Sequence, residues 1–267
     1  MGKHFTRGFT IIETMLVLAI TGVLIAGLLI GVGSSVSAQR YKDAVSTFKS
    51  LLQDQYSEVM NVSNDRDADW NCDADAIPTQ SASGIAPGQS DCVLLGRYVS
   101  VVGGEITTAV VVGFIPPGTT ESGASDVAAI KDSYVLGIST SSVTKTTLEW
   151  GAEIAWPKSG GGSRTPTMPR SIAILIVRSP TSGTSYTFTS DTVNEVGSVS
   201  AQTLSDMLVE STTQVPGQGE RTICIDPNGV GVPEKLAVYI GRAASGPGSI
   251  ESRSFTTIQQ NGGDSKC

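Results

Sequence analysis

Apolar residues near the N-terminus follow one another almost without interruption. Over residues 15–33 the only polar side chain is Thr21. A helix rises about 1.5 Å per residue, so this stretch is long enough to cross the hydrocarbon core of a bilayer. Lys3 and Arg7 precede it, and the positive-inside rule places that end in the cytoplasm and the rest of the chain on the far side. The pattern predicts one transmembrane helix.

Beyond this stretch the apolar positions become periodic. They recur at spacings of three, four or five residues, as in an amphipathic helix, at Val36, Tyr41, Val45, Phe48, Leu52, Tyr56 and Val59. The polar face carries Arg40, Lys42, Asp43, Lys49, Gln53, Asp54 and Glu58. No proline interrupts residues 9–60. We therefore expect one continuous helix of about 50 residues, apolar over its first half and amphipathic over its second.

Two simpler interpretations compete for the same segment. One is a secretory signal peptide cut after Ala38, because Val36, Ser37 and Ala38 have the small-residue form that signal peptidase accepts. The other is an uncleaved signal anchor on a surface or adhesion protein. The apolar stretch exceeds the usual signal core of about 7–15 residues, and the helical pattern continues past Ala38, so the pattern favours the continuous helix.

After Asn61 the pattern changes to short apolar or alternating segments divided by Gly, Pro, Ser and Asn. The predicted strands are Val93–Val102, Glu105–Phe114, Tyr134–Ser139, Val143–Trp156, Ile172–Arg178, Ser185–Thr189, Thr222–Asp226, Leu236–Ile240 and Arg253–Gln259. Gly103 and Gly104 predict a hairpin between the first two, and residues 226–229 predict a turn. The fold class is α+β, with the long N-terminal helix packed on an antiparallel sheet or sandwich.

Three further local features complete the predicted outer domain. Residues 200–211 predict a short helix with Leu204, Met207 and Leu208 on one face. Polar, glycine-rich stretches at residues 79–90, 116–125 and 158–169 predict surface loops. The tryptophans are expected in the core or at the rim of the sheet, at Trp70, Trp150 and Trp156. A ligand-binding aromatic platform is the less favoured alternative.

The charge balance bears on possible partners. The formal net charge is −7 and the pI is about 4.7. An acidic chain has no overall attraction for phosphate backbones, so general nucleic-acid binding is disfavoured. Arg164 and Arg170 flank a glycine-rich loop and leave open a small DNA-contacting patch.

The four cysteines, at Cys72, Cys92, Cys224 and Cys267, indicate disulfide bonds. They contain no CxxC pair and no neighbouring histidine that would complete a zinc site. Three connectivities are possible, and we favour the two local ones, Cys72 with Cys92 and Cys224 with Cys267. Disulfides imply an oxidising compartment outside the cytoplasm, which agrees with the predicted topology.

An acidic segment raises the question of a calcium site. Oxygen-bearing side chains alternate along residues 65–75, as they do in a calcium-binding loop. However, Trp70 stands where such a loop needs glycine, and Ala76 stands where it needs the bidentate glutamate. We favour a solvated acidic loop without a cofactor or metal, with Ca²⁺ as the less favoured alternative.

Residues 7–13, RGFTIIE, followed by an apolar helix, closely resemble the prepilin signal of type IV pilins and of type II secretion pseudopilins. The resemblance covers about the first 60 residues. It implies a leader of residues 1–8, cut between Gly8 and Phe9 by the prepilin peptidase, and N-methylation of Phe9. The outer domain resembles the minor pseudopilin H, and a bond between Cys224 and Cys267 would resemble the C-terminal disulfide loop of many type IV pilins.

The resemblance also implies a role for Glu13, whose carboxylate is costly inside a bilayer. In a bundle of staggered helices it would pair with the Phe9 ammonium of a neighbouring subunit. An intramolecular pair with Phe9, one turn away, is the competing interpretation. The implied partners are other pilin or pseudopilin subunits, the prepilin peptidase, the inner-membrane assembly platform and membrane lipid.

These expectations define three regions and a structural function. They are the leader 1–8, the helix 9–62 and the β-rich outer domain 63–267. The single histidine, His4, lies in the leader, so the processed chain would contain no Ser-His-Asp or Cys-His catalytic unit. We therefore expect a minor pilin or pseudopilin rather than an enzyme, exported from the inner or cytoplasmic membrane into a filament.

Overall fold

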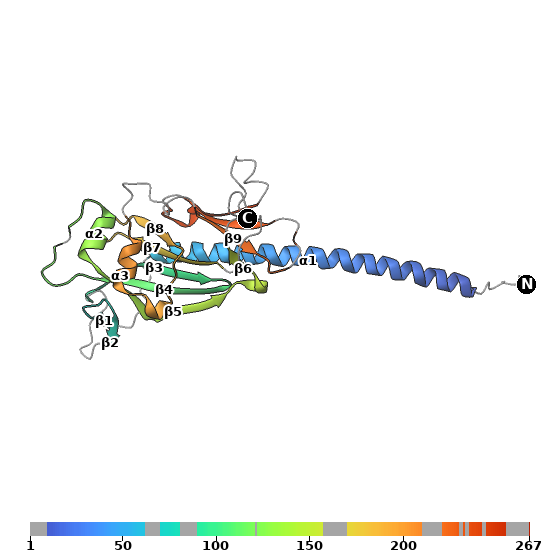
Figure 1. Ribbon diagram of the computed structural model, residues 1–267, viewed down its shortest axis with the longest axis horizontal. Coiled ribbons are helices and arrows are strands. Elements are labelled where there is room, and N and C mark those ends of the chain that lie inside the picture. The colour runs from blue at the N-terminus through green and yellow to red at the C-terminus, as the bar shows by residue number, and fades with distance from the viewer. Residues whose placement is uncertain are drawn as a thin grey trace, which may run out of the picture.

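The computed structural model describes residues 10–61, 70–80, 90–120, 122–156, 170–209, 221–229, 232, 235–241, 244–254 and 267. One long helix, α1 (Ile11–Asn61), projects from a β-rich outer domain (Figure 1). The first half of α1 stands free, and the second half lies within the domain. The α+β class and the continuous helix predicted from the sequence are confirmed.

The larger sheet has five antiparallel strands in the order β5-β4-β3-β7-β8. Their bounds are β3 (Cys92–Val102), β4 (Glu105–Phe114), β5 (Val135–Thr147), β7 (Ser171–Arg178) and β8 (Ser185–Ser190). The predicted hairpin joins β3 to β4, with Val102 paired to Glu105. Gly103 has a φ of 60° there, a conformation that favours glycine.

The smaller sheet has four antiparallel strands in the order β11-β10-β9-β6. Their bounds are β6 (Glu153–Ala155), β9 (Arg221–Asp226), β10 (Leu236–Ile240) and β11 (Ile250–Ser254). The second half of α1 lies between the two sheets (Figure 1) and shares one core with both of them. The helix is therefore the central layer of the domain and not an element added to one face.

A second core covers the opposite face of the larger sheet. Two short helices cover this face, α2 (Asp126–Ser133) and α3 (Ala201–Met207). In the predicted helix 200–211, Leu204 and Leu208 are buried as expected, but the helix ends at Met207. We did not predict α2, which is only eight residues long and starts directly after a polar loop. Ser125 caps it by accepting a hydrogen bond from the Ala128 amide.

The first cysteine pair holds a small hairpin that we did not predict. It consists of β1 (Trp70–Cys72) and β2 (Pro78–Gln80), so β2 includes the start of the loop expected at residues 79–90. Cys72 is bonded to Cys92 at the start of β3. The hairpin packs closely on β5, because a Cβ on Gly137 would lie 2.2 Å from the Ala76 carbonyl oxygen.

The second cysteine pair joins Cys224 in β9 to Cys267. The structure thus contains the two local pairings favoured from the sequence. The bond holds the last residue of the chain against the smaller sheet, where both cysteines are buried. The strand expected at residues 253–259 is instead β11, which starts at Ile250, and residues 255–259 lie outside the described part of the chain.

The prediction of two separate strands at residues 134–139 and 143–156 is wrong. β5 is one strand that runs through both as far as Thr147. The chain then makes the 3₁₀ turn η1 (Glu149–Gly151) and enters β6 of the other sheet. Trp150 and Gly151 have left-handed φ values of 59° and 70°, and these residues direct the chain from one sheet to the other. Two further 3₁₀ turns are η2 (Val196–Ser198) and η3 (Pro247–Ser249).

Candidate functional site: the N-terminal helix and its attachment to the outer domain

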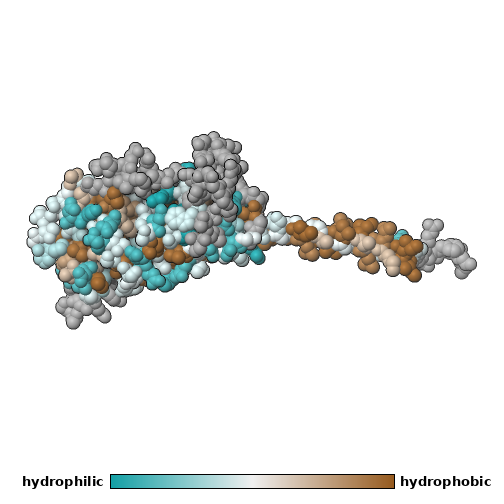
Figure 2. Space-filling view, in the orientation of Figure 1, coloured by the Kyte–Doolittle hydropathy of each residue, from teal (hydrophilic) through white to brown (hydrophobic). Residues whose placement is uncertain are grey.

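The free half of α1 exposes a continuous apolar surface. Its large hydrophobic side chains between Ile11 and Val32 are 51–77% exposed (Figure 2). By length and composition this helix can cross a membrane. Monomeric soluble proteins rarely expose an apolar patch of this extent, so the surface requires a lipid or protein environment.

The threonines of this half bond to the helix itself. The Thr21 hydroxyl donates to the Val17 carbonyl oxygen at 2.8 Å, and the Thr14 hydroxyl donates to the Ile11 carbonyl oxygen at 2.8 Å. A polar group left unsatisfied in hydrocarbon costs several kcal/mol. These local bonds explain how Thr21 is accommodated in the middle of the apolar stretch.

Glu13 lies in the first turn of α1 and is exposed. Its amide donates to the Thr10 hydroxyl at 3.3 Å, so Thr10 caps the helix. Thr10 and Glu13 have the T-x-x-E spacing of a capping box, a local signal that our reading of the sequence missed. A carboxylate in the first turn also interacts favourably with the positive end of the helix dipole. Gly8 and Phe9 lie outside the described residues.

The second half of α1 buries the predicted apolar stripe. Tyr41, Val45, Phe48, Leu52, Tyr56 and Val59 are each at most 6% exposed. Val36, the first member of the predicted stripe, is 41% exposed. The helix therefore enters the outer domain between Val36 and Tyr41, which leaves the span 15–33 clear of the domain.

Two tyrosines attach α1 to the sheets by hydrogen bonds. The Tyr41 hydroxyl donates to the Ile225 carbonyl oxygen at 2.8 Å and accepts from the Leu236 amide at 2.7 Å. The Tyr56 hydroxyl bonds to the Thr187 hydroxyl at 2.7 Å. Burial raises the pKa of both Tyr41 and Tyr56 to about 12.

We expect these two tyrosines to make the fold sensitive to alkali. The folded state favours the neutral phenol, so this stabilisation is complete below the ordinary tyrosine pKa of about 10. It is lost as the pH rises from 10 to 12, by up to about 2–3 kcal/mol for each group. The measurement is the free energy of unfolding by denaturant between pH 8 and pH 12. The Tyr41→Phe, Tyr56→Phe double variant should show a shallower loss over this range, and an unchanged slope would contradict the assignment.

Further contacts attach the C-terminal turns of α1. The Gln53 amide nitrogen donates to the Pro247 carbonyl oxygen at 3.1 Å. Arg178 of β7 donates to the Met60 carbonyl oxygen at 3.4 Å, one of the last carbonyls of the helix. Arg97 of β3 forms an ion pair with Glu58. The helix is thus held by polar contacts from both sheets as well as by the core.

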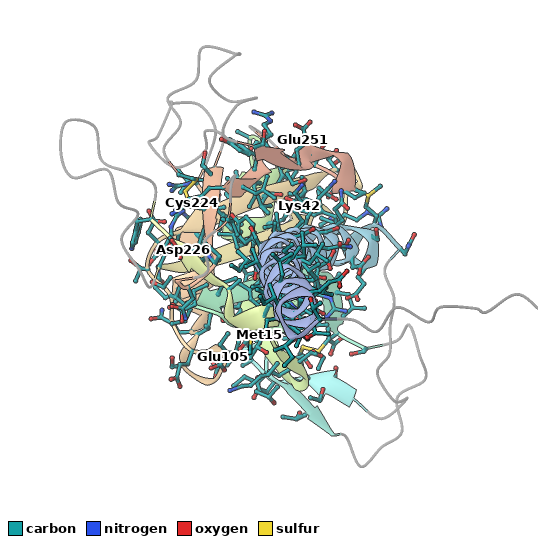
Figure 3. All side chains as sticks on the ribbon, turned by 90° about the vertical axis from the view of Figure 1, so that its right-hand side faces the viewer. Met15, Lys42, Glu105, Cys224, Asp226 and Glu251 are labelled. Carbon is teal, nitrogen blue, oxygen red and sulfur yellow. A yellow bond between two sulfur atoms is a disulfide. The ribbon has the colours of Figure 1, made fainter. Side chains whose placement is uncertain are left out.

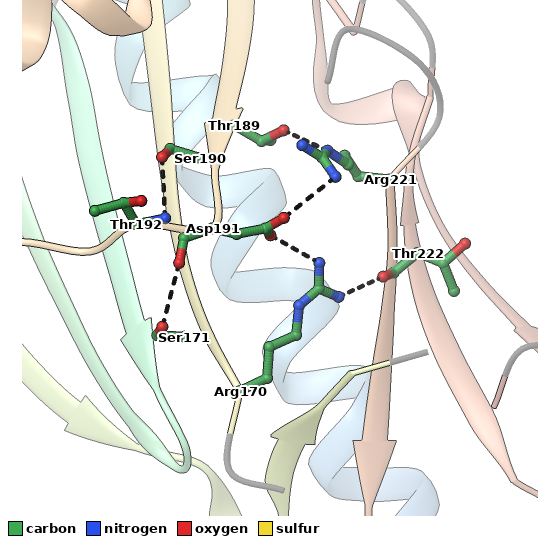
Figure 4. A network of polar contacts seen from close by, with 8 residues as sticks. All are labelled: Arg170, Ser171, Thr189, Ser190, Asp191, Thr192, Arg221 and Thr222. Atoms are coloured by element: carbon green, nitrogen blue, oxygen red, sulfur yellow. Dashed lines mark hydrogen bonds and ion pairs between the residues drawn. The ribbon is translucent and has the colours of Figure 1, made fainter. Parts of the chain in front are cut away.

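The structure does not support a DNA-contacting patch at Arg170. Its side chain is 2% exposed, and burial lowers its pKa. Its guanidinium donates to the Asp191 carboxylate at 3.1 Å and to the Thr222 carbonyl oxygen at 2.7 Å (Figure 4). Trp156 stacks on the same guanidinium, 4.5 Å from ring centroid to carbon. Arg164, the other arginine of that patch, lies outside the described residues.

The Arg170 network joins the two sheets. Asp191 follows β8 of the larger sheet, whereas Thr222 and Arg221 belong to β9 of the smaller one. Arg221 also pairs with Asp191, at 3.7 Å, and donates to the Thr189 hydroxyl at 2.8 Å (Figure 4). Arg170 therefore has a structural role, because it joins the two sheets that enclose α1. This role is visible only from its partners in the tertiary structure.

The described part of the acidic segment forms a turn of its own. The Asp73 carboxylate accepts hydrogen bonds from the amides of Asp75 and Ile77. Among the described residues, no three His, Cys, Asp or Glu side chains are grouped as metal ligands. Asp65, Asp67 and Asp69, the other carboxylates of the considered calcium loop, lie outside that part of the chain.

The N-terminal motif identifies the class of protein to which this chain is related. Residues 4–29 match the model of the prokaryotic N-terminal methylation motif. This is the prepilin signal of type IV pilins and pseudopilins, and it indicates a pilin-like precursor. The motif implies processing by the prepilin peptidase and assembly with other pilin subunits. Searches of curated proteins and of solved structures found no match to this chain.

Proposed function

We propose that this chain is a minor pilin or pseudopilin, a structural subunit of a type IV pilus or type II secretion filament. The observation that carries the proposal is the free half of α1, an exposed apolar rod that begins with the methylation motif and with Glu13. Such a surface suits two environments in succession, which are the bilayer and the core of a helix bundle. The role of the chain is assembly, and its outer domain faces outward.

In this proposal the leader 1–8 is removed between Gly8 and Phe9, and the new Phe9 amino group is methylated. That amino group is a cation in an apolar core, and Glu13 of a neighbouring subunit is the anion that pairs with it. Glu13 is exposed in the single chain, within the half of α1 that projects beyond the outer domain, so its carboxylate is accessible to a neighbouring subunit.

The proposed orientation has the N-terminus in the cytoplasm and the outer domain beyond the inner or cytoplasmic membrane. The basic residues before the span support it. The two disulfides support it as well, because they require an oxidising compartment. The inner-membrane assembly platform then extracts the subunit into the filament.

The experiment that tests the proposal is mass determination of the N-terminal peptide of the protein isolated from its own cells. We expect a chain that starts with N-methylated Phe9. A start at Gln39 would show a cleaved secretory signal and would overturn the proposal. Retention of Met1 would favour a plain signal anchor and would overturn it equally.

A further inference from the structure

The end of the outer domain from which α1 emerges includes two adjacent turns. One is the β3-β4 turn, and the other is the segment Thr147–Gly151 that contains η1. The Leu148 amide donates to the Gly104 carbonyl oxygen at 2.7 Å, and the Ile154 amide donates to the Gly103 carbonyl oxygen at 2.8 Å. Figure 3 looks along α1 from its free end onto this part of the domain. We call residues 102–105 and 147–151 the junction end.

The junction end carries exposed apolar side chains. Among the described residues outside α1, the exposed large hydrophobic side chains are Ile77, Val102 and Trp150. Two of these three lie at the junction end, and Trp150 is the more exposed of them at 56%. Most tryptophans are largely buried, so an indole that projects into solvent at this place requires an explanation.

The backbone holds Trp150 in its exposed position. Its φ of 59° is rare for a bulky residue and is normally seen where the surrounding structure enforces it. The enforcing contacts are the Leu148 bond to Gly104 and the Ala152 amide bond to Glu149 at 3.2 Å. The turn therefore presents the indole at a defined place beside α1.

The contact with Arg40 shows where the Trp150 indole lies along the axis of α1. Its guanidinium carbon lies 4.7 Å from the centroid of the Trp150 ring. Arg40 is also the first ionisable residue of the helix after Glu13. It lies seven residues past Gly33, or about 10 Å along the helix. The headgroup layer extends about 5–8 Å beyond the hydrocarbon on each side, so Arg40 and Trp150 lie at its outer margin.

We propose that the junction end binds the surface of the bilayer that α1 crosses, with the Trp150 indole in contact with the outer part of the phospholipid headgroups. Tryptophan is enriched at the membrane–water interface, because its ring is apolar and its N–H can donate to water or phosphate. Arg40 supplies a cation for the lipid phosphate. This contact would set the angle of the outer domain to the membrane, and extraction into a filament would have to break it.

The charges around the junction end indicate which class of lipid headgroup it binds. Lys145 pairs with Glu105 at 3.6 Å, and Glu149 is exposed beside Trp150. On the helix, Lys42 and Asp43 follow Arg40 and are both exposed. Among these described groups the acidic and basic residues are equal in number, so the contact needs no excess of anionic lipid. A zwitterionic phosphate headgroup is the chemistry that fits.

The test uses the full chain, unassembled, in phosphatidylcholine vesicles that contain lipid with a nitroxide spin label on its headgroup. We expect the spin-labelled lipid to quench a component of the tryptophan emission of the wild type. Trp150→Phe should lose that component, and Trp156→Phe should keep it, because Trp156 is stacked on the buried Arg170. Far-UV circular dichroism and thermal unfolding check that both variants fold.

A second measurement asks whether the indole holds the domain on the membrane. Hydrogen exchange of the amides in residues 147–151 should be slower in vesicles than in detergent, and Trp150→Ser should abolish this difference. Absence of quenching in the wild type, or equal quenching in Trp150→Phe, would overturn the proposal. Protection of the junction end only in assembled filaments would identify a neighbouring subunit as its partner and would also overturn it. These outcomes are independent of the N-terminal processing that tests the filament role.

Discussion

Glu13→Gln is expected to abolish incorporation of the subunit into filaments while leaving it in the membrane. The amide is nearly the same size as the carboxylate but lacks the charge that would compensate the Phe9 ammonium of a neighbour. Leaving one member of a buried ion pair without its partner costs about 3–5 kcal/mol. This corresponds to a loss of about a hundredfold to several thousandfold in the assembly equilibrium. The measurement is the ratio of subunit in sheared filaments to subunit in the membrane fraction.

A matched control is available on the same helix. Asp54 is an exposed carboxylate of α1 beyond the apolar half, so Asp54→Asn should assemble normally. The Glu13→Gln variant must also be processed at Phe9 and remain in the membrane, which separates an assembly defect from a failure of cleavage. Normal incorporation of Glu13→Gln would rule out the intermolecular pair and would favour the capping contact with Thr10 as the role of Glu13.

Gly96→Ala is expected to be the most disruptive single-methyl change among the described glycines. A Cβ at this position would lie 1.9 Å from the Ile176 carbonyl oxygen and 2.9 Å from the Val177 Cα. Gly96 is at an irregularity of β3, where the register shifts between residues 94 and 96. β3 and β7 are inner strands of the larger sheet, and the clashing atoms belong to backbone. The strands must therefore separate, because no side chain can move aside.

The expected cost combines two effects. Overpacking of a core costs about 1–3 kcal/mol, and each weakened ladder bond adds about 1 kcal/mol. We therefore expect a loss of about 2–4 kcal/mol in the free energy of unfolding, measured by denaturant with the disulfides intact. The control is Gly197→Ala, because no atom lies within 4 Å of a Cβ at that position. Equal stability of the two variants would show that β3 and β7 do not pair as described.

The elements that the sequence predicted well are those whose signal is local. Six members of the apolar stripe on α1 are buried as expected, because helical period reports directly which face can pack. The strands around Gly103 and Gly104 were found because the hairpin signal is two residues long. The divided prediction across residues 134–156 was wrong, because the local pattern does not mark where β5 ends and the chain passes through η1 to β6 of the other sheet.

The functional residues also fall into two groups, those that the sequence revealed and those that only the structure revealed. The methylation motif, the span and Glu13 are adjacent in the chain, so the sequence alone indicates the pilin-like class and the membrane anchor. The roles of Arg170 and Trp150 depend on residues far away in the chain. Arg170 was considered for DNA contact but is buried against Asp191 and Thr222, while Trp150 was expected in the core or at the rim and projects beside Arg40.

The sequence by itself therefore determined the long helix, its apolar first half, the α+β class and the N-terminal signal. These depend on contiguous residues and on the periods of helix and strand. Only the tertiary structure decided that α1 lies between two sheets, that Arg170 joins those sheets, and that Trp150 lies where the helix leaves the domain. These features arise from contacts between segments distant in the chain, and local pattern carries no information about which distant segments will meet.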